Sequence, residues 1–150
     1  MTVAPVVLDA TELTAYKISP DDTVVLVVLS GPTTSGSGTT VCFEIWEPRG
    51  AQPDNSHADS TETFVFLRGH GTAHSDEHTA EVSAGSVIVL PVGSVHHIVN
   101  TSDTEKLYSI TVMENDGGFE DLILRGTPTE LDADDLAVLA SAGVTGAGAR

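Results

Sequence analysis

The chain has 150 residues, of which 40% are hydrophobic and 19% charged, and this is the size and composition of one globular domain rather than of a disordered polypeptide. Acidic residues outnumber basic residues by 22 to 6, so the formal net charge is −16. A surface this acidic repels phosphate backbones and anionic lipid headgroups, and we therefore expect neither nucleic acid nor a membrane as a partner.

Cysteine usage and apolar runs indicate where the protein works. Cys42 is the only cysteine, so no disulfide forms within the chain, and a small buried side chain on a strand is its expected role. The chain does not open with a basic segment followed by an apolar run, and it has no run of about 18 apolar residues. We expect a cytoplasmic protein.

The N-terminal part begins with an apolar segment at residues 3–8. Residues 9–13 fit either a short helix or an edge segment, and the sequence leaves both open. A β-branched run predicts a strand at residues 24–29. A segment of small polar residues and glycines predicts a loop at residues 31–38, and a second strand is expected at residues 39–46.

Short strands and turns alternate closely through the middle of the chain. Gly69, Gly85 and the Pro-Val-Gly sequence at residues 91–93 mark three of the turns. Many short, evenly spaced strands indicate an all-β sandwich or barrel. The six strands predicted here span residues 63–67, 72–74, 79–82, 86–90, 96–99 and 107–113.

The C-terminal part changes to a helical period. Asp132 suits the N-cap position, acidic residues fill the first turn, and Gly143 suits the end of a helix. A short helix is therefore expected at about 132–142, packed through Leu136 and Leu139.

No internal repeat of a size that would indicate two barrels is present. We expect one domain over residues 1–150, with its barrel core at about 24–113. The Gly- and Ala-rich residues 144–150 are expected to be a disordered tail.

One segment carries a specific motif. Residues 85–100 have the pattern G-x5-P-x-G-x2-H-x3-N, and this sequence resembles the second motif of the cupin superfamily at each fixed position. The resemblance implies a cupin double-stranded β-helix, which is a jelly-roll barrel, in a small single-domain protein similar to quercetinase-like dioxygenases and polyketide-cyclase-like cupins. The fixed positions are Gly85, Pro91, Gly93, His96 and Asn100.

The first cupin motif, G-x5-H-x-H-x3–4-E-x6-G, is matched less closely by residues 50–69. Counted back from Gly69, Glu62 takes the carboxylate position and His57 takes the second histidine position. Asn55 stands where the family has its first histidine. This replacement is the clearest departure from the family pattern.

The resemblance implies a single divalent metal ion held by His57, Glu62 and His96. Asn55 offers only a neutral amide oxygen, so it is either a weak ligand or no ligand. Two imidazoles and one carboxylate are a common ligand set of iron(II) oxygenases, and the same set suits nickel, zinc or manganese. The sequence does not choose among these metals.

Side-chain alternation along the strand places Phe64 and Phe66 on the same side as Glu62. They are therefore expected to line the substrate pocket, and an apolar wall favours a small apolar or aromatic metabolite. Glu62 is the candidate catalytic base. The other histidines are expected to be exposed or structural, and these are His70, His74, His78 and His97.

Three functions remain open. The preferred one is a metal-dependent oxygenase that acts on a small-molecule substrate, because of the two-histidine, one-carboxylate set. The second is a non-redox cyclase or isomerase that uses the same site. The third is a non-catalytic cupin that binds a small molecule. A homodimer is expected, with residues 3–8 docking on a second barrel.

Overall fold

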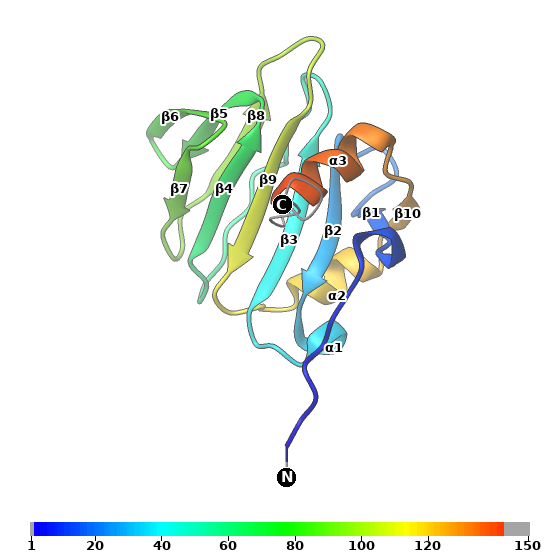
Figure 1. The fold of residues 1–150 in the computed structure, drawn as a ribbon. Helices are drawn as coiled ribbons and strands as arrows, with labels where there is room; N and C mark the ends of the chain where they lie inside the picture. The colour runs from blue at the N-terminus through cyan, green and yellow to red at the C-terminus, as the bar shows by residue number, and fades with distance from the viewer. Residues whose placement is uncertain (1, 143–150) are drawn as a thin grey trace.

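The computed structural model describes residues 2–142 and contains two antiparallel sheets (Figure 1). The larger sheet has the order β10-β1-β2-β3-β9-β4-β7, and the smaller has the order β6-β5-β8. The strands are β1 (Ala15–Lys17), β2 (Val24–Ser30), β3 (Thr40–Trp46), β4 (Glu62–Arg68), β5 (His70–Ser75), β6 (His78–Ser83), β7 (Val87–Leu90), β8 (His96–Asn100), β9 (Leu107–Met113) and β10 (Thr127–Thr129).

Four short helical elements accompany the sheets: η1 (Ala10–Glu12), α1 (Pro32–Ser35), α2 (Phe119–Leu124) and α3 (Ala133–Ala142). In Figure 1, α3 lies across one face of the larger sheet, and α1 and α2 lie near one end of it. Strands dominate the described residues, and this arrangement is the all-β jelly-roll barrel that the sequence indicates. Within residues 2–142, no helix has the length and apolar character needed to cross a bilayer.

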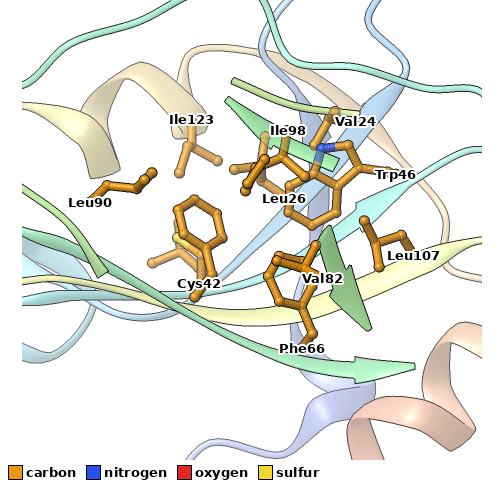
Figure 2. Packing of buried hydrophobic residues seen from close by; sticks show 13 residues of the cluster. Val24, Leu26, Cys42, Trp46, Phe66, Val82, Leu90, Ile98, Leu107 and Ile123 are labelled. Atoms are coloured by element: carbon orange, nitrogen blue, oxygen red, sulfur yellow. The ribbon is translucent and has the colours of Figure 1, made fainter. Parts of the chain in front are cut away.

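The larger sheet is apolar on both faces, so two clusters of buried side chains form. Along β3, Cys42 and Trp46 belong to the cluster inside the barrel, whereas Phe43 and Ile45 belong to the cluster on the opposite face. The inner cluster joins side chains from both sheets and from α2 (Figure 2). Burial on both faces gives β2 and β3 nearly continuous apolar sequences instead of simple alternation.

The outer cluster is closed by α3, which begins with a pair of reciprocal hydrogen bonds. The backbone N–H of Asp135 donates to Asp132 Oδ1 (2.8 Å), and the backbone N–H of Asp132 donates to Asp135 Oδ2 (3.0 Å). Asp132 therefore caps the helix as expected. Leu139 packs into the cluster as expected. Val138 is the second buried residue that α3 contributes to it, whereas Leu136 is only half-buried.

The expected strands are found, with ends that differ by a few residues. Residues 107–113 form β9 with the expected bounds. Residues 9–13 contain the short helix η1, which settles the alternative left open by the sequence. The expected loop at residues 31–38 contains α1. The expected disordered tail at residues 144–150 lies outside the described residues.

Candidate metal centre

Glu62 is the first residue of β4 and points into the barrel. It pairs with Leu90 of β7 and with Met113 of β9, so strands flank it on both sides. Alternation along β4 puts Glu62, Phe64 and Phe66 on the buried face, and only 3% of Glu62 is exposed. A carboxylate this deeply buried needs hydrogen-bonding or charged partners, because its desolvation without them costs on the order of several kcal/mol.

His96 reaches Glu62 from the smaller sheet. It begins β8 directly after the turn that contains Gly93, whose φ of 80° is a conformation that favours glycine. The His96 side chain is buried, and its Nε2 lies 2.9 Å from Glu62 Oε2. The motif in residues 85–100 thus builds a turn that directs one imidazole into the barrel.

His57 reaches the same carboxylate from the segment between β3 and β4. Its Nε2 lies 3.2 Å from Glu62 Oε2, and its carbonyl oxygen accepts a hydrogen bond from the backbone N–H of Gly93 (2.9 Å). The rings of His57 and His96 are 5.4 Å apart between centroids. One potential ligand atom from each of the three residues lies within 4.8 Å of the others, so these side chains can hold one metal ion.

The two imidazoles determine the charge state of Glu62. Burial by itself raises the pKa of this carboxyl, but the hydrogen bonds from His57 and His96 outweigh burial and keep the pKa below its ordinary value. Glu62 is therefore an anion at neutral pH, as a metal-binding carboxylate must be.

Both ring nitrogens of His96 face oxygen atoms. Nδ1 lies 3.2 Å from the carbonyl oxygen of Ser94, and Nε2 faces Glu62. A neutral imidazole has one N–H and can donate to only one of these oxygens. When Nδ1–H donates to Ser94, the Nε2 lone pair and the carboxylate face each other and require a cation, which is either a proton or a metal ion.

Asn55 lies beside the three residues. Its backbone exchanges two hydrogen bonds with His96, from Asn55 N–H to His96 O (3.0 Å) and from His96 N–H to Asn55 O (2.8 Å). Its side-chain Oδ1 is buried and has no hydrogen-bond partner among the described residues. An unpaired acceptor on a residue that lines the same cavity as His57 and Glu62 fits a bound cation, and the residues present therefore suit a metal.

A cavity of about 230 Å³ opens next to these side chains. Its walls are mainly apolar and come from β2, from the segment between β3 and β4, and from α2. The lining residues are Ile18, Ser19, Asp22, Val24, Leu26, Ala51, Gln52, Pro53, Asn55, His57, Glu62, Phe119 and Leu122. A wider groove of about 580 Å³ near η1 and β10 contains no histidine and shares no residue with this cavity.

Phe64 and Phe66 correct one expectation. Both rings are buried on the same face as Glu62, but neither belongs to the lining of the 230 Å³ cavity. They stack on each other with ring centroids 6.1 Å apart, and both contact Trp46 in the inner cluster. The strand pattern correctly places them inside the barrel, but packing between the sheets puts them in solid core instead of at the cavity wall.

Several cavity residues were not expected from the sequence. Phe119 and Leu122 belong to α2, a helix that the sequence interpretation missed, and Gln52 lies in the irregular segment between β3 and β4, at a position that the first motif leaves unspecified. Glu44 is fully buried inside the barrel and bonds to Gln52. A lone acidic residue in an otherwise apolar strand, as in β3, is the one sequence signal that points to this group.

The other histidines stay apart from the candidate centre. His97 points the opposite way from His96; its Nδ1 lies 2.6 Å from Asp54 Oδ1, and its ring stacks on His74 with centroids 4.5 Å apart. His70 and His78 are exposed. Within residues 2–142, the group of His57, Glu62 and His96 is the metal-binding cluster that the geometry supports.

Comparison with known proteins agrees with this fold. Residues 42–113 match the family model described as a cupin domain. Both motif segments and all three candidate ligands fall within that range, and the barrel around them has the same architecture. This match covers 72 of the 150 residues and supports a small protein of the cupin superfamily. No curated protein matches the sequence.

Solved structures with the same fold include three of particular relevance. A predicted oxalate decarboxylase from Thermotoga maritima is 22% identical, with 72% of this chain and 97% of that chain covered and a TM-score of 0.63. A cupin 2 conserved barrel domain protein from Salinispora arenicola is 21% identical, with 95% and 98% covered and a TM-score of 0.56. A recombinant oxalate oxidase in complex with glycolate is 20% identical, with 67% and 55% covered and a TM-score of 0.57.

The likeness to these structures concerns the fold. This chain spans little more than half of the oxalate oxidase, with 55% of that chain covered, but nearly all of the Salinispora protein, with 98% covered. The match to the Salinispora protein also includes 95% of this chain, so the resemblance extends beyond the barrel motifs.

Proposed function

We propose that this protein is a metal-dependent cupin enzyme that acts on a small apolar or aromatic metabolite. The observation that carries the proposal is the convergence of His57, Glu62 and His96, from three separate segments, within 4.8 Å of one another at the wall of a cavity. A non-catalytic binding barrel needs no such set of an anionic carboxylate and two imidazoles.

The site residues would share the catalytic work. A divalent metal ion held by His57, Glu62 and His96 supplies Lewis-acid activation of a substrate oxygen and lowers the pKa of a bound hydroxyl. Ser94 fixes the ring of His96 through Nδ1. Glu62 is the candidate general base, because it is anionic and faces the cavity, and it would accept the substrate proton. Phe119 excludes water from one side.

The cavity favours a neutral organic substrate. Its lining contains the acidic side chains Asp22 and Glu62 but no lysine or arginine. A small dianion such as oxalate would meet no fixed positive side chain there, so it would depend on the metal alone. Two of the similar structures are described as an oxalate oxidase and a predicted oxalate decarboxylase, and we propose a different substrate class for this chain.

Oxygenation is the preferred reaction because two histidines and one carboxylate leave coordination positions for both substrate and oxygen. A non-redox cyclisation or isomerisation is the second candidate. One observation favours it: the barrel holds a second carboxyl, Glu44, whose pKa is raised well above its ordinary value by burial and by the charge of Glu62. Two neighbouring carboxyl groups whose pKa values are shifted in opposite directions are an arrangement that proton-transfer reactions use.

Metal analysis tests the proposal. Purified protein is reconstituted separately with iron(II), nickel, zinc or manganese and desalted, and its metal content is measured together with those of the His57→Ala and Glu62→Ala variants. We expect about one metal ion per chain in the native protein and a loss in both variants. His97→Ala is the matched control, because this neighbouring histidine faces away and bonds to Asp54. Metal that is absent, or that survives both substitutions, overturns the proposal.

Oxygen consumption then separates the two reactions. Each metal-loaded form is mixed with a panel of enolic and phenolic aromatics while dissolved oxygen and products are followed. Consumption of oxygen in step with substrate supports an oxygenase. Product formation without oxygen uptake supports the cyclase or isomerase. Tight binding without turnover on any metal supports the non-catalytic barrel instead.

We also propose a cytoplasmic homodimer. The N-terminal segment is strongly exposed at Val3 and Val7, at 91% and 86%, which suits docking on a second barrel. Cys42 is a buried free thiol, which is compatible with a reducing compartment. Light scattering of the chain with and without residues 2–8 tests the dimer, and fractionation of the source cells tests the location. If the full chain and the chain without residues 2–8 are both monomers, the proposed homodimer is wrong.

A further inference from the structure

Two amide side chains at the cavity wall have oxygen atoms without partners. Gln52 and Asn55 both line the cavity, and Gln52 Oε1 and Asn55 Oδ1 are buried with no hydrogen-bond partner among the described residues. Leaving such an acceptor unpaired costs about 1–3 kcal/mol. Asn55 lies next to the metal ligands, which accounts for its oxygen. The Gln52 side chain is instead bonded to Glu44, which is not one of the candidate ligands, and its oxygen requires another explanation.

Glu44 determines which way the Gln52 amide faces. Gln52 Nε2 donates a hydrogen bond to Glu44 Oε2 (3.0 Å), so the amide nitrogen is committed to the carboxyl and Oε1 is left as the free end. The backbone of Gln52 is also held, because its N–H donates to the carbonyl oxygen of Ile98 (3.3 Å). The acceptor is therefore fixed in orientation before any ligand arrives.

Glu44 itself is hard to explain as a core residue. It is fully buried on the inner side of β3, between Cys42 and Trp46, and pairs across the sheet with Leu26, which lines the cavity. Its second oxygen, Oε1, also has no partner. An apolar side chain of similar volume would fill this position at lower cost, since a buried carboxyl with an unpaired oxygen is destabilising. Thr111 and Gln52 both interact with this carboxyl and lower its pKa against the effect of burial, and of these two only Gln52 lines the cavity.

We propose that Gln52, positioned by Glu44, is a substrate-binding residue whose amide oxygen accepts a hydrogen bond from a hydroxyl group of a neutral aromatic or enolic substrate. Glu44 is the positioning residue, because it acts through Gln52. The Gln52 oxygen disfavours carboxylates, which would place a negative oxygen atom against it. The proposal rests on the proposed function in one respect, since it takes the 230 Å³ cavity as the substrate site.

The test compares two ligands that differ by one hydroxyl group. Binding of 2-naphthol and of naphthalene is measured by fluorescence titration on chelator-treated native protein and on Gln52→Leu. The measured quantity is the ratio of the naphthalene Kd to the 2-naphthol Kd, so changes in pocket shape largely cancel. We expect this ratio to fall roughly fivefold in Gln52→Leu, as for the loss of one hydrogen bond. An unchanged ratio overturns the proposal, and so does a lack of binding by either ligand to the native protein.

Two variants of Glu44 test the positioning role. Glu44→Gln keeps an oxygen that accepts from Gln52 Nε2, so the native ratio should be retained. Glu44→Leu has no acceptor, so the ratio should fall toward that of Gln52→Leu. A fall of the same size in both variants, or in neither, contradicts the role of Glu44. Circular dichroism and thermal melts establish that each variant is folded.

Metal analysis of the same preparations before chelation keeps the two proposals separate. Because the ligand ratio is measured without metal, a protein that fails to bind metal can still show the Gln52-dependent preference. Conversely, a protein that binds metal through His57, Glu62 and His96 but shows no such preference retains the proposed enzyme function and loses the hydroxyl subsite.

Discussion

Two of the regions that bury a carboxylate in this molecule treat it in opposite ways. Where α1 meets α2, Glu120 accepts hydrogen bonds from the backbone N–H and the hydroxyl of Thr33 (2.7 and 2.5 Å) and from the same two groups of Thr34 (3.0 and 2.7 Å). Burial opposes ionisation, but these donors outweigh it and lower the pKa of Glu120 to about 2. The chain itself satisfies this group completely.

The two carboxyl groups inside the barrel have different surroundings from those of Glu120. Glu62 faces two imidazoles that are also potential metal ligands, and Glu44 keeps one oxygen without a partner. The pKa of Glu44 is raised well above its ordinary value, whereas that of Glu120 is lowered. Burial alone therefore does not mark a functional carboxyl. Glu62 is distinguished by the two potential metal ligands beside it, and Glu44 by an oxygen atom without a hydrogen-bond partner.

The largest effect is expected for Glu62→Gln, which changes one oxygen to an amide nitrogen and removes the anionic ligand. Metal affinity should fall by at least about 100-fold, or ~2.7 kcal/mol. Isothermal titration with zinc measures the change. Glu120→Gln is the matched control at the other buried carboxylate and should bind zinc with native affinity. An equal loss of zinc affinity in Glu62→Gln and Glu120→Gln would contradict the proposed difference between the two regions.

The second prediction concerns the free energy of unfolding, and here Glu120→Gln is the variant that should show the effect. Glu120→Gln should lower the free energy of unfolding by about 2 kcal/mol, because an amide cannot accept all four hydrogen bonds. The folded-state pKa of Glu120 lies below its ordinary value of 4.5, so its contribution is present above pH 4.5 and is lost as the pH falls toward about 2. Urea unfolding at several pH values measures this, and a difference that is constant with pH contradicts it.

A smaller gain is expected at the residue that departs from the family motif. Asn55→His replaces a neutral amide oxygen with an imidazole beside His57 and His96, and metal affinity should rise about tenfold, or ~1.4 kcal/mol. Competition with a chromophoric chelator measures the affinity. An unchanged value would place Asn55 outside the coordination sphere, and its unpaired oxygen would then need a substrate donor.

The smallest effect is expected for Glu44→Gln, and its sign is opposite to that of Glu120→Gln. The folded-state pKa of Glu44 is above its ordinary value of 4.5, so the native protein loses stability as the pH rises above 4.5. Substitution with a neutral amide removes this loss. The metal-free variant should therefore be more stable than the native protein by up to about 1 kcal/mol near pH 7, with a smaller difference at pH 4. Urea unfolding at both pH values decides the sign.

The barrel and the chain positions of the candidate metal ligands could be predicted from the sequence. Alternation and turn residues predicted the strands, including residues 107–113 with their observed bounds, because side-chain period and turn conformation are local properties. The spacing of Gly93 and His96 in the second motif likewise indicated a turn that aims an imidazole inward. His57 and Glu62 followed from the family resemblance.

The surroundings of those residues depend on how distant segments pack, so they could not be predicted from the sequence. A strand pattern shows that Phe64 and Phe66 are buried, but whether a buried side chain meets solid core or a cavity depends on segments far away in sequence, here Trp46 and α2. The pairing of Glu44 with Gln52 also joins an inward strand position to an irregular segment, whose path is set by hydrogen bonds to β8. Packing between distant segments, which no local period records, therefore shaped the cavity.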